Sequence, residues 1–170
     1  MTQKQPPDAS VDTAAFRRAL SCFATGVAVV TALDRDGDKI GITINSFSSV
    51  SLDPPLVLWS IAEESQNYEV FAQAKDFAVH VLAAHQADLV DRFAQRDRDQ
   101  FEGIQCRDGR HGVPILPDWA ACFECSTEHI YPGGDHEIIV GRVHRFEARD
   151  ADPLVLYRSE FLRQEGPPVK

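Results

Sequence analysis

The 170-residue sequence lacks any apolar run approaching the roughly 20 residues that a membrane-spanning helix needs. Its first ten residues are polar, include two adjacent prolines and lack the apolar core of a signal peptide. Positive charge is also scarce, because 17 Lys and Arg stand against 26 Asp and Glu and leave a net charge of −9. Nucleic acids and anionic membranes both need a basic patch, so neither is an expected partner. We expect a cytoplasmic protein.

Cysteine is also scarce, and its spacing predicts no metal site. Cys122 and Cys125 have the C-x-x-C spacing, and His129 follows four residues later, which raises zinc or redox chemistry as an alternative. The surrounding residues A-A-C-F-E-C-S-T-E-H-I indicate a strand, where side chains three positions apart point to opposite faces. A second C-x-x-C pair is absent. We therefore expect reduced, buried cysteines and no bound metal.

The glycine-rich motifs that usually hold nucleotides are missing as well. No G-x-G-x-x-G follows an expected strand and no Walker loop is present, so any nucleotide must be held in another way. There is no internal repeat and no linker that would separate two domains. We expect a disordered N-terminal tail over residues 1–11, one domain over residues 12–163 and a C-terminal tail over residues 164–170.

What the sequence does contain is a series of strands joined by turns. Asp12 or Thr13 can cap a helix that reaches about Ala24, with an apolar stripe at helical spacing. Two shorter helices are predicted over residues 66–74 and 86–94. The predicted strands cover residues 27–33, 39–45, 56–59, 77–82, 120–131, 136–147 and 154–157. This density of hairpins predicts a mainly β protein, an antiparallel barrel with two or three flanking helices.

One segment is unusually rich in small polar side chains. Five of the nine residues from Thr43 to Ser51 carry hydroxyls, and Asn45 adds an amide. Two prolines follow and lead directly into an apolar strand. Apolar and polar residues do not alternate strictly along the segment, which predicts a kink or bulge near Phe47. Such segments are often only solvated surface. Small donors on a stiff backbone can also approach a flat polar heterocycle, so our hypothesis is that this segment holds a flavin.

A second segment, Y-P-G-G-D-H-E, presents two polar side chains at a hairpin. Its paired glycines allow a tight turn, which places Asp135 and His136 at the mouth of that hairpin. An isolated loop histidine is usually just exposed. A histidine held at the start of a strand beside an aspartate is a better candidate for contacting a ligand.

These residues resemble the short-chain flavin reductase family, whose members have an FMN-binding split barrel. The similarity is carried by T-I-N-S-F-S-S-V-S-L-D-P-P-L-V-L and by G-D-H-E-I-I-V-G-R-V further along. Three more segments agree in the same order: F-R-R-A-L-S-C-F-A-T-G-V-A-V-V-T, D-F-A-V-H-V-L and D-R-F-A-Q-R-D-R-D-Q-F-E-G-I. The resemblance extends over residues 12–163.

The resemblance implies a homodimer that binds FMN or FAD and reduces it with NADH or NADPH, often for a partner monooxygenase. His136 is then the candidate catalytic residue beside the nicotinamide, with Tyr157 and Arg158 completing the nicotinamide site. The flavin-binding residues implied by the matching motifs are Thr43, Asn45, Ser46, Phe47, Ser48, Ser49, Ser60, Ile61, Ser65, Arg92 and Phe93.

Two alternatives remain open from the sequence. One is a non-catalytic flavin-binding module of the same fold. The other is a split-barrel oxidase of a small amine, which would need a basic phosphate site, whereas Lys and Arg are sparse between residues 41 and 65. The sequence does not distinguish FMN, FAD and riboflavin, nor NADH and NADPH.

Overall fold

The computed structural model describes residues 11–94 and 99–162. The first element is helix α1 (Thr13–Leu20). Its start is fixed by Asp12, whose carboxylate accepts hydrogen bonds from the backbone N–H groups of Ala14 and Ala15 at 2.9 and 3.2 Å. The predicted cap is therefore confirmed, although the helix ends at Leu20, earlier than expected. No side chain of α1 is buried.

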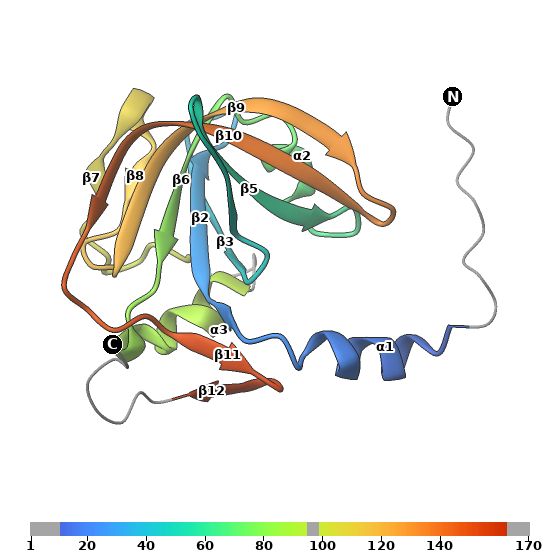
Figure 1. The fold of residues 1–170 in the computed structure, drawn as a ribbon. Coiled ribbons are helices and arrows are strands. Elements are labelled where there is room, and N and C mark those ends of the chain that lie inside the picture. Colours follow the sequence, from blue (N-terminus) through green and yellow to red (C-terminus); the bar gives the residue numbers. More distant parts are fainter. Residues whose placement is uncertain (1–10, 95–98, 163–170) are drawn as a thin grey trace.

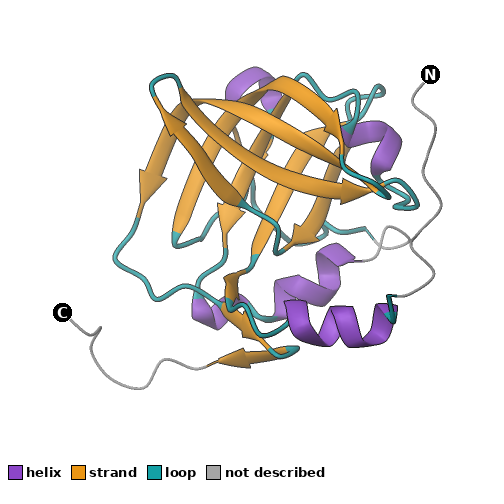
Figure 2. Ribbon diagram, turned by 45° about the vertical axis from the view of Figure 1, so that its right-hand side comes forward, coloured by secondary structure: helices purple, strands orange, loops and turns teal. Residues whose placement is uncertain are grey.

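Seven antiparallel strands form the main sheet, in the order β3–β2–β6–β9–β10–β5–β4. Figure 2 shows the sheet curled into a barrel, which confirms the expected fold class. Three hairpins, β2–β3, β4–β5 and β9–β10, pair strands that follow one another in the chain. The strands are β2 (Ala28–Leu33), β3 (Lys39–Ile44), β4 (Ser48–Leu52), β5 (Pro55–Ala62), β6 (Asp76–Val81), β9 (Ala121–Pro132) and β10 (His136–Ala148).

The remaining elements are short and lie around this barrel. A three-stranded sheet in the order β1–β11–β12 and a two-stranded sheet of β7 and β8 accompany it. Figure 1 shows β11 and β12 below the barrel, at the level of α1 and α3. The elements are β1 (Thr25–Gly26), α2 (Tyr68–Phe71), η1 (Ala84–Gln86), α3 (Asp88–Ala94), β7 (Arg107–Asp108), η2 (Arg110–Gly112), β8 (Pro114–Ile115), β11 (Val155–Tyr157) and β12 (Glu160–Leu162).

The sheet has a hydrophobic core on each of its faces. Strand β2 shows why, because its residues alternate: Val30 belongs to one buried cluster and Val29 to the other. The first cluster fills the barrel around Trp59, which packs edge-on against Phe71 and Phe77 at ring distances of 5.2 and 5.9 Å. The second cluster lies outside the barrel, beneath α3 and the segment that contains β8.

The two cysteines of the C-x-x-C pair belong to different cores. Cys125 packs inside the barrel and Cys122 packs in the outer cluster, so they lie on opposite faces of β9 as predicted. All four cysteines are unpaired thiols. Burial raises the pKa of the Cys122 and Cys125 thiols to about 12, which keeps them protonated and unreactive at neutral pH.

Two further expectations concern the chain termini and membrane-spanning helices. The predicted tails over residues 1–11 and 164–170 lie almost wholly outside the described residues and stay predictions. Among the described residues, no helix has the length and apolarity that crossing a membrane requires.

Candidate functional site

The polar segment breaks between two strands, as the sequence predicted. Strand β3 ends at Ile44 and β4 begins at Ser48, so residues 45–47 form a turn at one end of the barrel. The pairing of β4 with β5 then shifts between Ser49 and Ser51, which is the register change of a β-bulge. The kink and the bulge together turn the hydroxyl-bearing side chains in several directions.

The turn is fixed to the barrel by Ser46. Its hydroxyl accepts a hydrogen bond from the backbone N–H of Ser60 at 3.0 Å and lies 3.2 Å from the carbonyl oxygen of the same residue. Ser48 pairs with Leu58 at the start of β4. The N–H and carbonyl groups of Ser60, two residues further along β5, therefore lie where β4 would pair if it began two residues earlier. The Ser46 side chain therefore takes the place of a backbone partner for Ser60 and holds the turn against β5.

The other side chains of the segment do not face one surface. Thr43 points toward α3, where its hydroxyl donates to the carbonyl oxygen of Val90 at 2.8 Å. Ser48 and Ser49 are exposed on β4. Asn45 faces a cavity beside α1. The structure thus divides the predicted flavin-binding residues into separate groups.

The sheet register places His136 next to the part of β5 that Ser46 binds. In the pairing of β10 with β5, His136 is opposite Ala62 and Ile138 is opposite Ser60. Residues two apart on a strand share a face, so His136 and Ser60 lie on the same side of the sheet on adjacent strands. The backbone N–H of Glu63 donates to the carbonyl oxygen of Asp135 at 3.0 Å, which fixes the hairpin mouth to the end of β5.

The imidazole of His136 has a defined orientation. Its Nδ1 lies 2.7 Å from a carboxylate oxygen of Asp135. A carboxylate only accepts hydrogen bonds, so Nδ1 carries the proton of this contact. The side chain of His136 is 45% exposed, so a ligand can contact it.

Two predicted flavin-binding residues pack into the barrel core, and a third caps a turn. The side chain of Ile61 is 1% exposed, so it can reach a ligand only through its backbone. Phe47 packs against the inner cluster, with its ring 5.4 Å from that of Phe123. Ser65 accepts a hydrogen bond from the backbone N–H of Asn67 at 3.3 Å, just before α2.

The side chains of Arg92 and Phe93, on α3, both contact other residues of the chain. Phe93 is fully buried, with its ring 5.2 Å from that of Phe101 and packed directly over Gly41, where a Cβ atom would lie 2.4 Å from the ring. Arg92 donates to the carbonyl oxygens of Gln100, at 2.7 Å, and Glu102. The side chain of Phe93 is therefore a core residue in this structure, and its contact with a flavin stays a prediction.

Tyr157 and Arg158 belong to the small sheet and not to the His136 region. They form the expected aromatic–basic pair, with the guanidinium 5.2 Å from the centre of the Tyr157 ring. Arg158 shares a cavity of about 550 Å³ with Asn45 and with residues of α1. Sequence reasoning did not select Arg17, Ser21 or Thr25, which also line this cavity, although they fall in the segment F-R-R-A-L-S-C-F-A-T-G that matched the family.

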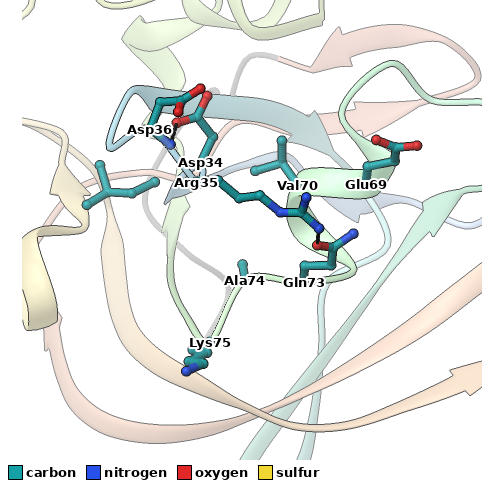
Figure 3. A pocket seen from close by; sticks show the side chains of 9 residues that line it. Asp34, Arg35, Asp36, Glu69, Val70, Gln73, Ala74 and Lys75 are labelled. Atoms are coloured by element: carbon teal, nitrogen blue, oxygen red, sulfur yellow. Dashed lines mark hydrogen bonds between the residues drawn. The ribbon is translucent and has the colours of Figure 1, made fainter.

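Another cavity, of about 460 Å³, contains none of the predicted site residues. It lies between the β2–β3 turn and α2, where Figure 3 shows Arg35 reaching across to Gln73. Asp34, one of its acidic residues, is used by the turn itself, accepting from the backbone N–H groups of Asp36 and Asp38 at 2.9 and 2.8 Å. We assign this cavity no function.

Comparisons with known proteins agree with this architecture. The family model described as "Flavin reductase like domain" matches residues 20–164. An Agrobacterium fabrum protein named "FMN reductase (NADH) SmoA" is 48% identical over 148 residues, which are 87% of this chain and 84% of that protein. The solved Streptomyces globisporus C-1027 NADH:FAD oxidoreductase SgcE6, in complex with NAD and FAD fragments, superposes with a TM-score of 0.86 at 33% identity and covers 94% of this chain and 96% of its own.

Some relatives are much longer than this chain. The reductase component of an Acinetobacter baylyi flavin-dependent trigonelline monooxygenase is 40% identical over 147 residues, which are 86% of this chain but 47% of that protein. The chain likewise spans about half of a Rhizobium meliloti relative, 49% of its length. Because the family model matches most of the sequence and the fold agrees, the chain belongs to the flavin reductase family and is a split barrel of that fold.

Proposed function

We propose that this chain is an NADH-dependent flavin reductase that transfers a hydride from the nicotinamide to FMN or FAD. The observation that carries the proposal is the placement of the Ser46 turn and His136 on the two sides of β5, near the end of that strand. The names of the Agrobacterium and Streptomyces relatives, an FMN reductase (NADH) and an NADH:FAD oxidoreductase, support the same reaction.

The residues of this region suit an uncharged, planar ring system. The segment from residue 41 to 65 contains no Lys or Arg, and its turn is held rigid by Ser46. A flavin supplies the electron-accepting ring when it is bound, so the protein needs only to bind and orient the two partners. The exposed hydroxyls of Ser48 and Ser49 can donate to polar ring edges, and Nε2 of His136 can orient the nicotinamide.

The reduced flavin is the product that this enzyme would pass on. We infer a partner monooxygenase that takes up the reduced flavin, because the Acinetobacter relative is named as the reductase component of such a system. The free thiols of all four cysteines suit a reducing compartment, so we place the reaction in the cytoplasm.

The protein is proposed to act as a homodimer, and α1 supports this. An isolated helix shorter than about 12 residues is marginal in water, yet α1 has eight residues and buries none of them. The apolar side chains on and just after α1 are open to solvent, since Phe16 is 54% exposed, Leu20 57% and Phe23, beyond the helix, 78%. Its basic residues are Arg17 and Arg18, on a chain with a net charge of −9. An acidic second copy offers both the apolar cover and the opposite charge.

The test follows the absorbance of the reduced nicotinamide after NADH is mixed with the protein and excess FMN, FAD or riboflavin. Rapid, flavin-dependent oxidation of NADH is the expected result. A yellow protein that retains flavin but does not oxidise NADH would support the non-catalytic flavin-binding module instead. Repeating the assay with NADPH measures the nicotinamide preference.

A further inference from the structure

Two side chains from distant parts of the sequence close the edge of β3 at Gly41. Strand β3 is the first in the seven-strand order, so one of its edges has no strand neighbour among residues 11–94 and 99–162. At Gly41 the backbone N–H donates to Oε1 of Gln100 at 3.1 Å, and the carbonyl oxygen accepts from Nδ2 of Asn67 at 3.3 Å. Both bonds are buried, so these side chains take the place of a neighbouring strand at this residue.

Gln100 connects this edge to α3, which Figure 1 shows below the barrel next to β3. The carbonyl oxygen of Gln100 accepts from Nε of Arg92 at 2.7 Å, so the helix holds its backbone while its buried side chain holds Gly41. Helix α3 also meets β3 directly, because the Phe93 ring packs where a Cβ atom at position 41 would lie. Helix and strand are therefore joined at Gly41 by packing and by a hydrogen bond.

Asn67 connects the same point to the segment between β5 and α2. Its backbone N–H donates to the hydroxyl of Ser65 at 3.3 Å, and its side chain bonds to Gly41. A carbonyl oxygen only accepts hydrogen bonds, so the NH2 group of the Asn67 amide is the end that faces Gly41. The loop that carries Ser65 is thereby attached to β3.

The other end of the Asn67 amide indicates that the position requires this donor. Its Oδ1 is buried and has no hydrogen-bond partner within residues 11–94 and 99–162. A buried acceptor without a partner is unfavourable, and an apolar side chain of the same size would avoid it. We therefore expect the bond from Nδ2 to Gly41 to be the reason for an asparagine here.

Three groups of predicted flavin-binding residues are joined at this point, although they lie far apart in the sequence. The segment 43–46 follows Gly41 along β3 and into the Ser46 turn. Asn67 and Gln100 attach the other two groups through the bonds described above. The three groups are residues 43–46, Ser65, and the pair Arg92 and Phe93.

We propose that Asn67 and Gln100 are positioning residues for the flavin site, which hold these three groups in one arrangement through the backbone of Gly41 without contacting the flavin. The inference rests on the proposed function. Because β3 leads from Gly41 into the turn at residues 45–47, loss of either bond would let that turn move relative to Ser65 and α3. Binding groups must be held within about 0.5 Å of their productive geometry, so such supporting bonds affect affinity.

The experiment uses variants of the full-length protein that lose one of these bonds. Asn67→Leu removes the donor together with the unpaired Oδ1, so its thermal unfolding midpoint should change little. Gln100→Met removes the acceptor, whereas Gln100→Glu keeps an oxygen in its place. Flavin fluorescence without NADH measures FMN affinity, and circular dichroism measures the unfolding midpoint and the visible signal of bound FMN. Asn67→Leu and Gln100→Met should bind FMN about tenfold more weakly with an altered visible signal, and Gln100→Glu should stay within about threefold of the unmodified chain.

Thr31→Val is the matched control for a loss of stability alone. Thr31 lies opposite Gly41 on β2, and its buried hydroxyl donates to the carbonyl oxygen of Pro114 at 2.6 Å. Valine keeps the shape of the side chain and removes this bond. The variant should unfold at a lower temperature and keep the FMN affinity and the visible signal of the unmodified protein.

Three results would overturn the assignment. Affinity losses that follow the unfolding midpoints of all the variants, Thr31→Val included, would show that Asn67 and Gln100 act only on stability. Unchanged FMN affinity in Asn67→Leu and Gln100→Met would show that the site does not depend on these bonds, and equal losses in Gln100→Met and Gln100→Glu would show that the acceptor oxygen is not required. The proposed function fails separately, if the unmodified protein oxidises no NADH with FMN or FAD, because these comparisons measure flavin binding without turnover.

Discussion

Nδ1 of His136 donates to the carboxylate of Asp135 across 2.7 Å, so Nε2 is the ring nitrogen that is left for another partner. The two residues are adjacent in sequence and follow directly on the tandem glycines of the hairpin. Gly134 adopts a φ of 86°, which glycine tolerates readily, and the chain then enters β10 at His136. The pair thus presents one ring nitrogen next to the strand that Ser46 braces.

We expect His136→Ala to lower kcat more than flavin affinity. Loss of an orienting contact to the nicotinamide should reduce kcat roughly ten- to hundredfold, while the flavin dissociation constant changes by less than about threefold. Steady-state NADH oxidation and flavin fluorescence titration measure the two quantities. His85→Ala is the matched control, because His85 forms an equivalent 2.7 Å contact with Asp118 far from this hairpin. Equal losses of kcat and flavin affinity would contradict the role given to His136.

A larger side chain at position 48 should exclude the flavin. Ser48 is exposed on β4, and its hydroxyl donates to the carbonyl oxygen of the adjacent Ser49 at 3.3 Å, so the fold does not depend on this hydroxyl. Ser48→Leu should raise the flavin dissociation constant about tenfold by steric exclusion, whereas Ser48→Ala should change it little. Calorimetry or fluorescence titration of both variants decides the point. Unchanged affinity of the leucine variant would mean that the ring lies elsewhere.

Local patterns predicted the parts of this fold that depend on neighbouring residues. The Asp12 cap, the break at residues 45–47 and the opposite faces of Cys122 and Cys125 all follow from backbone geometry over a few residues. The order of hairpins was accessible for the same reason. The short strands β1, β7, β8 and β12 were missed, because two or three residues carry no periodicity that could identify them.

The site was predicted less completely, because burial depends on contacts between distant residues. Ile61 and Phe93 lie within matching motifs, but only the packed structure shows that their side chains fill cores. Helical spacing predicted the apolar stripe of α1, and the structure leaves its Phe16 and Leu20 exposed in the chain. Periodicity shows that a helix has an apolar face and cannot show which molecule covers it.

The exposed stripe of α1 leads to a prediction about assembly. Phe16→Glu combined with Leu20→Glu should convert a dimer into a monomer, because both changes place charge on the face that we expect a second copy to cover. Sedimentation equilibrium measures the molar mass, and circular dichroism checks that the fold persists. Ala14→Glu is the control, since it adds one negative charge to the opposite side of the helix. A dimer that survives the double substitution would exclude α1 from the interface.

The last prediction concerns His80, a histidine buried completely in the sheet. Its Nδ1 lies 3.1 Å from the carbonyl oxygen of Val29, and its Nε2 accepts from the backbone N–H of Leu116 at 3.2 Å, so the ring is neutral and fully bonded. Burial lowers the pKa of His80 to about 4, against an ordinary value of 6.5. Below pH 6.5 the unfolded chain therefore takes up a proton that the folded protein refuses.

This difference makes the free energy of unfolding fall as the pH decreases. The contribution of His80 is fully present above pH 6.5 and should be lost progressively down to about pH 4, by about 3 kcal/mol in total. Urea unfolding of the protein and of His80→Gln at pH 7.5, 5.5 and 4.5, values spanning roughly that window, isolates the effect. Glutamine can keep a donor and an acceptor but does not titrate, and the carboxylates that titrate in both proteins cancel in the difference. The unmodified protein should lose stability more steeply than the variant, and parallel profiles would show that His80 does not resist protonation in the folded state.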